Sequence, residues 1–293
     1  MANSKWIIGF PRYTESITYS GGSWESNYPL NNIKVLPFAK VARSTNDANA
    51  STILYGVLPS SKPLELFMIC NDNISINANI KITLYDGDIT SSPAPAEITN
   101  TGWLKRYDSV YDWQSPFASW DSGNFHDRTF SADDLAGSPR NKVIYIQGGN
   151  YARSFKLEID DEDNADGFVQ IGLLEVASAV ALDNAPQLGA NYGFNARTTM
   201  TQSEGGAKYF ERRNKFRVFS GVLPYYDRST ALNVFYELFR RNDIDTPFIW
   251  YPDIDDVLNQ NRNAFLARNA GLDLFSRVLT PYDAIPINIE EVL

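Results

Sequence analysis

Short apolar runs separated by turn-forming clusters dominate the first two thirds of the chain. Leu64 to Cys70 form a nearly continuous apolar run that indicates a buried strand. Ile80, Ile82 and Leu84 alternate with polar neighbours, as in a strand with one buried face. Because no helical periodicity intervenes between such runs, the pattern predicts an antiparallel β-sandwich or jelly roll over residues 31–182.

One long segment, residues 89–141, interrupts this pattern and is rich in aromatic residues. A loop of that length inside a compact domain is either functional or conceals strands. We therefore expect either an aromatic contact surface or unrecognised strands here. The candidate contact residues are Trp103, Tyr107, Tyr111, Trp113 and Trp120.

The composition shifts near residue 183, which predicts a second domain over 183–293. This part shows a strand near 197–201, a turn around Gly205 and Gly206, a strand over 216–222, and several later strands. A covering helix is expected over 229–241, with Asp227 or Ser229 as its N-cap. Its apolar stripe at helical spacing comprises Leu232, Phe235, Tyr236 and Phe239.

Residues 1–30 are rich in Gly, Ser, Tyr and Pro and have little apolar core of their own. We expect an N-terminal arm that docks on a neighbouring domain or subunit. This segment does not resemble a signal peptide, and no stretch approaches the ~18 apolar residues that span a bilayer. The sequence therefore predicts folding in a cytoplasm without membrane insertion.

Charge and residue content narrow the function. The formal net charge of -9 would repel phosphate backbones, so nucleic acid is a poor partner. His126 and Cys70 are the only residues of their types, which excludes multi-histidine zinc sites, and Cys70 is expected to be a core thiol. No Gly-x-Ser-x-Gly elbow or nucleotide-binding glycine motif is present. We predict a protein that is not an enzyme and needs no cofactor.

An acidic turn over residues 160–167 is the main candidate metal site, and the acidic patch at 253–256 is a weaker one. Asp161, Asp163 and Asp166 offer the oxygen ligands that calcium prefers, although their spacing does not match an EF-hand. A solvated hairpin turn is the favoured interpretation.

Parts of the chain resemble a known family. The stretches Asn31–Ile33, Ala39–Ser44, Ile53–Leu58 and Leu64–Asn73 resemble the opening of galactose-binding-like (discoidin-type) jelly-roll domains in bacteriophage tail proteins. The last hundred residues, with the helix followed by Thr246–Asp253 and a closing strand, are similar to another element of phage tail-tip proteins.

The resemblance implies a virion structural protein of a tailed phage, of the distal-tail or minor-tail type, at the tail tip or baseplate. It would be assembled in the host cytoplasm as a homo-oligomeric ring, with a hexamer favoured and a trimer as the alternative. Other tail proteins would be its partners.

Two other functions stay open. A carbohydrate-binding adhesin would recognise a host surface glycan by stacking sugar rings on Trp103, Trp113 or Trp120. A glycan-cleaving enzyme needs only two carboxylates, and no pair can be chosen among 35 Asp and Glu residues.

Overall fold

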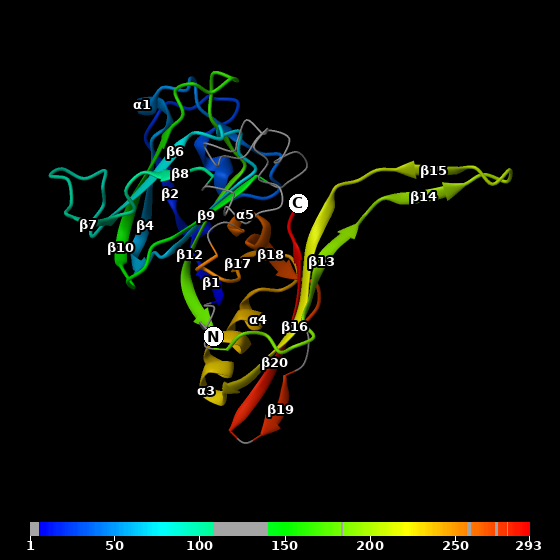
Figure 1. Cartoon of the computed structure of the whole chain (residues 1–293). Helices are drawn as coiled ribbons and strands as arrows, with labels where there is room; N and C mark the ends of the chain where they lie inside the picture. Colours follow the sequence, from blue (N-terminus) through cyan, green and yellow to red (C-terminus); the bar gives the residue numbers. More distant parts are fainter. Residues whose placement is uncertain (1–5, 108–139, 183, 257–258, 273–274, 280) are drawn as a thin grey trace, which may run out of the picture.

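The structure of the protein is a computed structural model (Figure 1). It describes residues 6–107, 140–182, 184–256, 259–272, 275–279 and 281–293. Two antiparallel sheets form most of the body, and a long ribbon projects from one side of it.

The larger sheet runs through the whole body. Its strands, in spatial order, are β13 (Asn191–Ala196), β16 (Lys215–Asp227), β20 (Tyr282–Glu291), β18 (Phe265–Asn269), β17 (Phe248–Tyr251), β1 (Trp6–Arg12), β12 (Leu173–Leu182), β5 (Leu66–Cys70) and β9 (Asn141–Tyr145), with β19 (Ser276–Leu279) beside β20.

The smaller sheet faces one end of the larger one. Its strands, in order, are β2 (Thr18–Ser20), β4 (Leu54–Pro63), β10 (Tyr151–Asp160), β6 (Asn79–Tyr85) and β7 (Glu97–Asn100), with β8 (Leu104–Lys105) beside β6. Two further strand pairs are β3 (Ala42–Arg43) with β11 (Gln170–Ile171), and β14 (Thr199–Gln202) with β15 (Lys208–Glu211). The helical segments are η1 (Thr14–Ser16), η2 (Leu30–Lys34), α1 (Asn49–Thr52), α3 (Arg228–Thr230), η3 (Ala231–Tyr236), α4 (Glu237–Arg241) and α5 (Gln260–Asn263).

The two sheets enclose the first core. Phe155 of β10 packs edge to face on Phe67 of β5, with ring centroids 5.1 Å apart, and both side chains are fully buried. Alternate residues of β10 and β6, among them Leu157 and Ile82, fill the same core because successive side chains of a strand point to opposite faces. The predicted mostly antiparallel sandwich is confirmed.

Strand β5 is buried on both faces, which explains its nearly continuous apolar sequence. Phe67 and Ile69 point into the sandwich core. Leu66, Met68 and Cys70 point the other way, into a cluster that also contains residues of β17 and β18. The expectation that Cys70 is a core thiol is confirmed.

The segments α3, η3 and α4 form one continuous helix from Arg228 to Arg241, which confirms the predicted covering helix. Asp227 caps it by accepting a hydrogen bond from the Ser229 amide at 3.0 Å.

The buried stripe of this helix differs in part from the prediction. Ala231, Phe235 and Leu238 are buried against the sheet, whereas Leu232 and Tyr236 are 44% and 52% exposed. Phe235 of the predicted stripe is buried and Phe239 packs against the same core, so the prediction is confirmed for these two side chains. Ala231 and Leu238 complete the buried face at ordinary helical spacing.

Residues 6–30, within the segment expected to be an N-terminal arm, contribute strands to both sheets. β1 lies between β12 and β17, and Ile7 and Ile8 are buried. β2 pairs with β4 of the smaller sheet. The physical reason is the Trp6–Phe10 stretch, whose alternate apolar side chains fill cores on both faces of the larger sheet.

The described parts of the 89–141 segment hold the short strands β7 and β8 at the edge of the smaller sheet. Among the described residues, no helix is both long and apolar enough to cross a bilayer.

Candidate interaction surface

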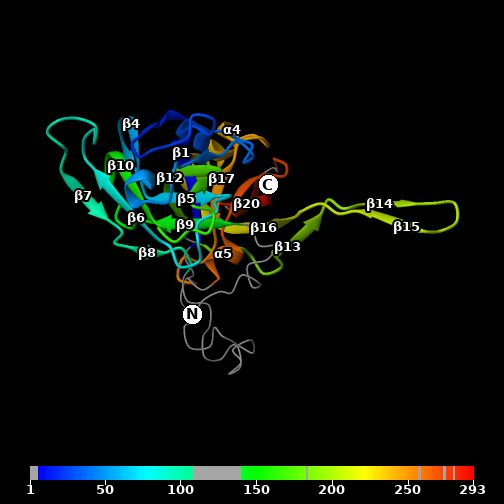
Figure 2. The same ribbon diagram turned by 90° about the horizontal axis from the view of Figure 1, so that it is seen from above.

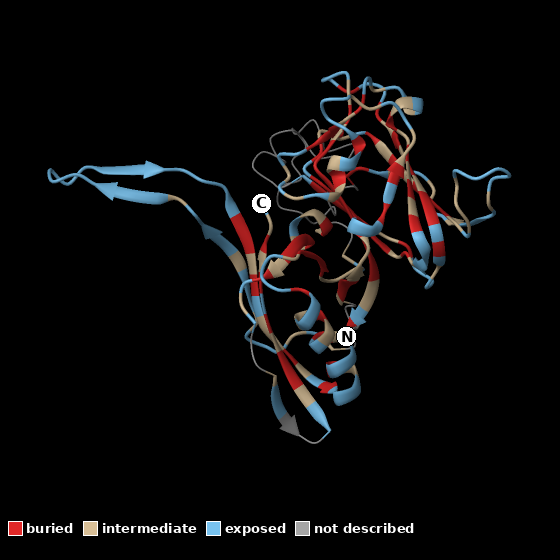
Figure 3. Ribbon diagram, turned by 180° about the vertical axis from the view of Figure 1, so that it is seen from behind, coloured by how far each residue is buried: buried red, intermediate tan, exposed pale blue. Residues whose placement is uncertain are grey.

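Residues 188–215, which we call the arm, leave the body as a long ribbon (Figures 1 and 2). The arm begins with β13, continues through the hairpin formed by β14 and β15, and returns into β16. None of its 28 residues is buried. In Figure 3 the ribbon is mostly pale blue, the colour of exposed residues, with tan stretches towards the body.

Large apolar side chains are nevertheless frequent on the arm. Tyr192 is 85% exposed and Leu188 is completely exposed. The others are Phe194, Met200, Tyr209 and Phe210, which are 51–67% exposed. Single exposed apolar residues are normal on proteins, whereas a contiguous group marks an interaction site.

The tip of the arm has no support beyond its own hairpin. β14 pairs only with β15 in the described structure, from Thr199 opposite Glu211 to Gln202 opposite Lys208. An isolated two-stranded hairpin is marginally stable in water, because it has no second layer on which to bury a face. A surface that covered one face of this hairpin would therefore stabilise it.

The root of the arm, by contrast, is held firmly. Arg217, two residues after the arm, is buried and donates from Nε to Glu291 at 3.0 Å. Its Nη1 also donates to the carbonyl oxygens of Asn261, Arg262 and Ala264, each at 3.0 Å. Because β16 carries this side chain directly into the body and pairs with β13, the base of the arm is anchored to the body.

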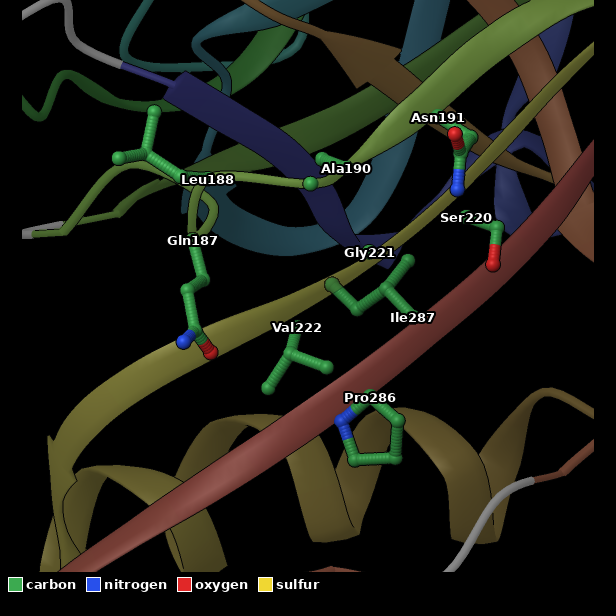
Figure 4. Close-up of a pocket in the computed structure, with 10 residues that line it drawn as sticks. Gln187, Leu188, Ala190, Asn191, Ser220, Gly221, Val222, Pro286 and Ile287 are labelled. Carbon is green, nitrogen blue, oxygen red and sulfur yellow. The ribbon is translucent and has the colours of Figure 1, made fainter.

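An open groove of about 250 Å³ lies at the arm's root, between the 187–191 loop and strands β16 and β20 (Figure 4). Its apolar lining includes Leu188, Val222 and Pro286, and its polar lining includes Gln187 and Ser220. None of its lining residues is Asp, Glu, His, Cys, Lys or Arg. The groove therefore offers packing and a few hydrogen bonds but no general acid or base.

Of the predicted aromatic contact residues, two lie in the described structure. Trp103 is 49% exposed, and the Lys81 ammonium lies 5.9 Å from the centre of its ring. Tyr107 is buried, with the Arg106 guanidinium 4.5 Å from its ring centre. Tyr111, Trp113 and Trp120 lie outside the described residues, as does His126.

Beside Tyr107, Arg106 is fully buried and pairs with Asp72 at 2.7 Å. Burial raises the pKa of Asp72, and the attraction of Arg106 opposes that rise. The pair joins the end of the smaller sheet to the segment after β5, so its role is to hold these elements together.

The acidic turn places its three candidate ligands in different settings. Asp161 is buried and accepts hydrogen bonds from the Ser75 amide at 3.0 Å and the Asn164 side chain at 2.7 Å. Asp166 accepts from Asn73 at 2.9 Å, and Asp163 is exposed. In the described parts of the chain, no three His, Cys, Asp or Glu side chains are grouped to hold a metal ion.

Cys70 is not placed for nucleophilic chemistry. Burial raises the pKa of its thiol well above the usual range, which disfavours the reactive thiolate.

The arm was only partly visible in the sequence. The expected turn at Gly205 and Gly206 is present, and Gly206 adopts a positive φ of 83°. The projection itself was missed. The available signal was the stretch from Thr198 to Lys215, in which polar and basic residues accumulate.

No protein-family model matches the sequence, and a search of curated proteins finds no match. Three solved structures are similar to parts of the fold. The family 32 CBM from C. perfringens NanJ, in complex with galactose, has a TM-score of 0.37 and 13% identity, covering 58% of this chain and 98% of that one. The lectin-binding domain of Lectinolysin complexed with Lewis b has a TM-score of 0.38 and 11% identity, covering 59% and 99%.

The third is an f-lectin (fucolectin) from Morone saxatilis (striped bass) serum, with a TM-score of 0.37 and 8% identity, covering 97% of this chain and 99% of that one. No family assignment follows from these similarities.

Proposed function

We propose that the protein is a structural subunit of a larger protein assembly, in which the arm contacts another chain. The observation that carries this proposal is the arm itself: 28 consecutive residues without one that is buried, yet with six large apolar side chains. Water-exposed aromatic surface of this kind is stabilised when a partner covers it.

The firm root supports the same function. Arg217 and the four residues that accept its hydrogen bonds fix β16 where it enters the body, so the base of the arm leaves the body in a defined direction. A contact that is presented in one orientation loses less conformational freedom on binding than a flexible tail does.

The specific assembly we propose is the tail tip or baseplate of a tailed bacteriophage, with the protein as a ring component and platform for other tail proteins. This proposal rests on the sequence resemblance to tail-tip proteins and on the arm as a means of joining subunits. Shape and burial, not catalysis, would do the work.

The test is the mass of the purified protein by light scattering after size exclusion, at several concentrations. We expect a discrete oligomer, with a hexamer favoured over a trimer. A monomer at every concentration would contradict a self-assembling ring.

A second candidate function is recognition of a glycan by the sandwich, and Trp103 is the observation that favours it. Its half-exposed indole next to Lys81 offers an apolar face and a hydrogen-bond donor, which are the two components of sugar recognition. The site would lie at the edge of the smaller sheet, away from the arm.

The variant Trp103→Ala tests this second function, with Tyr151→Ala as the matched control because Tyr151 is an exposed aromatic residue elsewhere on the same sheet. If the function is correct, the chain binds a glycan on an array, and Trp103→Ala weakens that binding at least about tenfold, or about 1.4 kcal/mol. Equal binding by both variants would exclude Trp103 as the platform.

A further inference from the structure

The arm and the rest of the chain carry opposite charge. The arm contains five basic residues and two acidic ones, which gives a formal charge of +3. The five basic residues are Arg197, Lys208, Arg212, Arg213 and Lys215. Since the whole chain has a formal charge of -9, everything outside the arm carries -12.

The basic side chains lie among the exposed aromatic ones. Lys208 directly precedes Tyr209 and Phe210, and all three are exposed. Arg212 and Arg213 follow at the end of β15, where Arg213 donates to Glu211 at 2.9 Å. Tyr, Phe and Arg are the residues most enriched in protein–protein contacts, so the arm combines an apolar anchor with a charge that selects the partner surface.

We propose that the arm of one copy docks on the acidic body of a second copy, in a head-to-tail contact. This inference rests on the proposed function and names the partner and the geometry of the contact. Two arms with a charge of +3 repel each other, whereas an arm and a body with a charge of -12 attract. Arm-to-body contact is therefore favoured over arm-to-arm contact.

The symmetry of the assembly follows from this choice. An arm-to-arm contact would use the same surface on both subunits and would end at a dimer. An arm-to-body contact uses two different surfaces, so each copy can bind one neighbour with its arm and another with its body. Such a contact closes into a ring or continues into a filament.

The first experiment reverses the charge of the arm in the full chain. The arm variant carries Lys208→Glu, Arg212→Glu and Arg213→Glu. The control variant carries Lys40→Glu, Lys62→Glu and Lys105→Glu, which are exposed residues of the body and change the net charge equally. We expect light scattering to show loss of the oligomer for the arm variant and retention for the control, and the wild-type oligomer to dissociate as salt is added.

The second experiment tests the head-to-tail geometry. Residues 197–214 are replaced by an Asn-Gly turn, which joins Ala196 and Lys215, a directly paired couple in the β13–β16 register. This shortened chain keeps the acidic body and loses most of the basic arm. Added to the wild type, it should bind wild-type arms on its body but offer no arm to a further copy, and so stop the assembly and lower the average mass.

The outcomes separate the two proposals. A wild-type chain that is monomeric under all conditions overturns both the self-assembling ring and the head-to-tail contact. The head-to-tail contact is overturned if the arm variant forms the same oligomer as the wild type. It is also overturned if the shortened chain does not lower the average mass of the wild-type oligomer. In both cases the proposed function still stands. If a duplex oligonucleotide binds the monomeric wild type but not the arm variant, the arm is a nucleic-acid-binding element and the inference is wrong. Near-UV circular dichroism of each variant confirms an intact body before these results are compared.

Discussion

Strands β10 and β14 differ in how far the rest of the chain buries them. β10 lies between β4 and β6, and Ala152, Phe155, Leu157 and Ile159 on it are completely buried. β14 has one neighbour, β15, and all four of its residues are exposed. The first strand is stabilised by its own chain, and no other described strand lies beside or beneath the β14–β15 pair.

A segment can therefore form a strand and pair with a neighbour without packing against a second layer of the fold. Both strands pair with a neighbouring strand through their backbones, but only β10 also buries a face against a second layer. We interpret the unsupported strand as the part of the molecule that another chain completes, and the following predictions test that interpretation.

The largest expected effect comes from removing an aromatic residue in each region. Phe155→Ala should reduce the free energy of unfolding by about 3–5 kcal/mol, because it leaves a cavity next to Phe67 at the centre of the sandwich. Phe210→Ala on the arm should change it by less than about 0.5 kcal/mol in the monomer. Denaturant unfolding of both variants measures the contrast, and equal effects would contradict it.

The next prediction concerns the root of the arm, where body and arm meet. Glu291→Gln leaves the Arg217 charge buried without its counter-ion and should cost about 3–5 kcal/mol in denaturant unfolding. The neighbouring Glu290→Gln is the control: its partner Arg268 is partly exposed, so the expected cost is at most about 1 kcal/mol. Similar losses would show that the root is not anchored by the buried pair.

The smallest effect is expected on the exposed side of the helix. Hydrogen bonds from Arg240 and Arg241 lower the pKa of Glu237 from 4.5 to about 2. A lowered pKa means that the ionised form stabilises the fold above pH 4.5 and that this contribution is lost as the pH falls to about 2. Wild type should therefore be slightly more stable than Glu237→Gln at neutral pH, and the difference in denaturant unfolding should disappear towards pH 2. A pH-independent difference would contradict this account.

Much of the body could be predicted from the sequence. The alternation at Ile80, Ile82 and Leu84, and the apolar run ending at Cys70, correctly indicated strands of a sandwich. The helix over 229–241 was visible from its cap and periodicity. Its buried stripe was predicted only in part, because apolar residues occur at several helical spacings in this segment and the sequence alone does not show which of them face the sheet.

Long-range pairing was beyond the sequence. β1 lies between β12 and β17, whose residues are more than 160 positions away, and nothing local in Trp6–Arg12 marks those neighbours. The arm was hidden for a related reason. A strand such as Lys208–Glu211 has ordinary local features, and only the tertiary structure shows that no second layer of described residues lies against it.

The most direct test of the central claim is hydrogen–deuterium exchange of the wild-type protein, compared between its assembled form and its monomer. Our account predicts that peptides covering β14 and β15 exchange rapidly in the monomer and become protected in the assembly, while peptides covering β10 are equally protected in both. Arm peptides that exchange equally fast in the two forms would show that no other chain covers the arm, and would contradict the account.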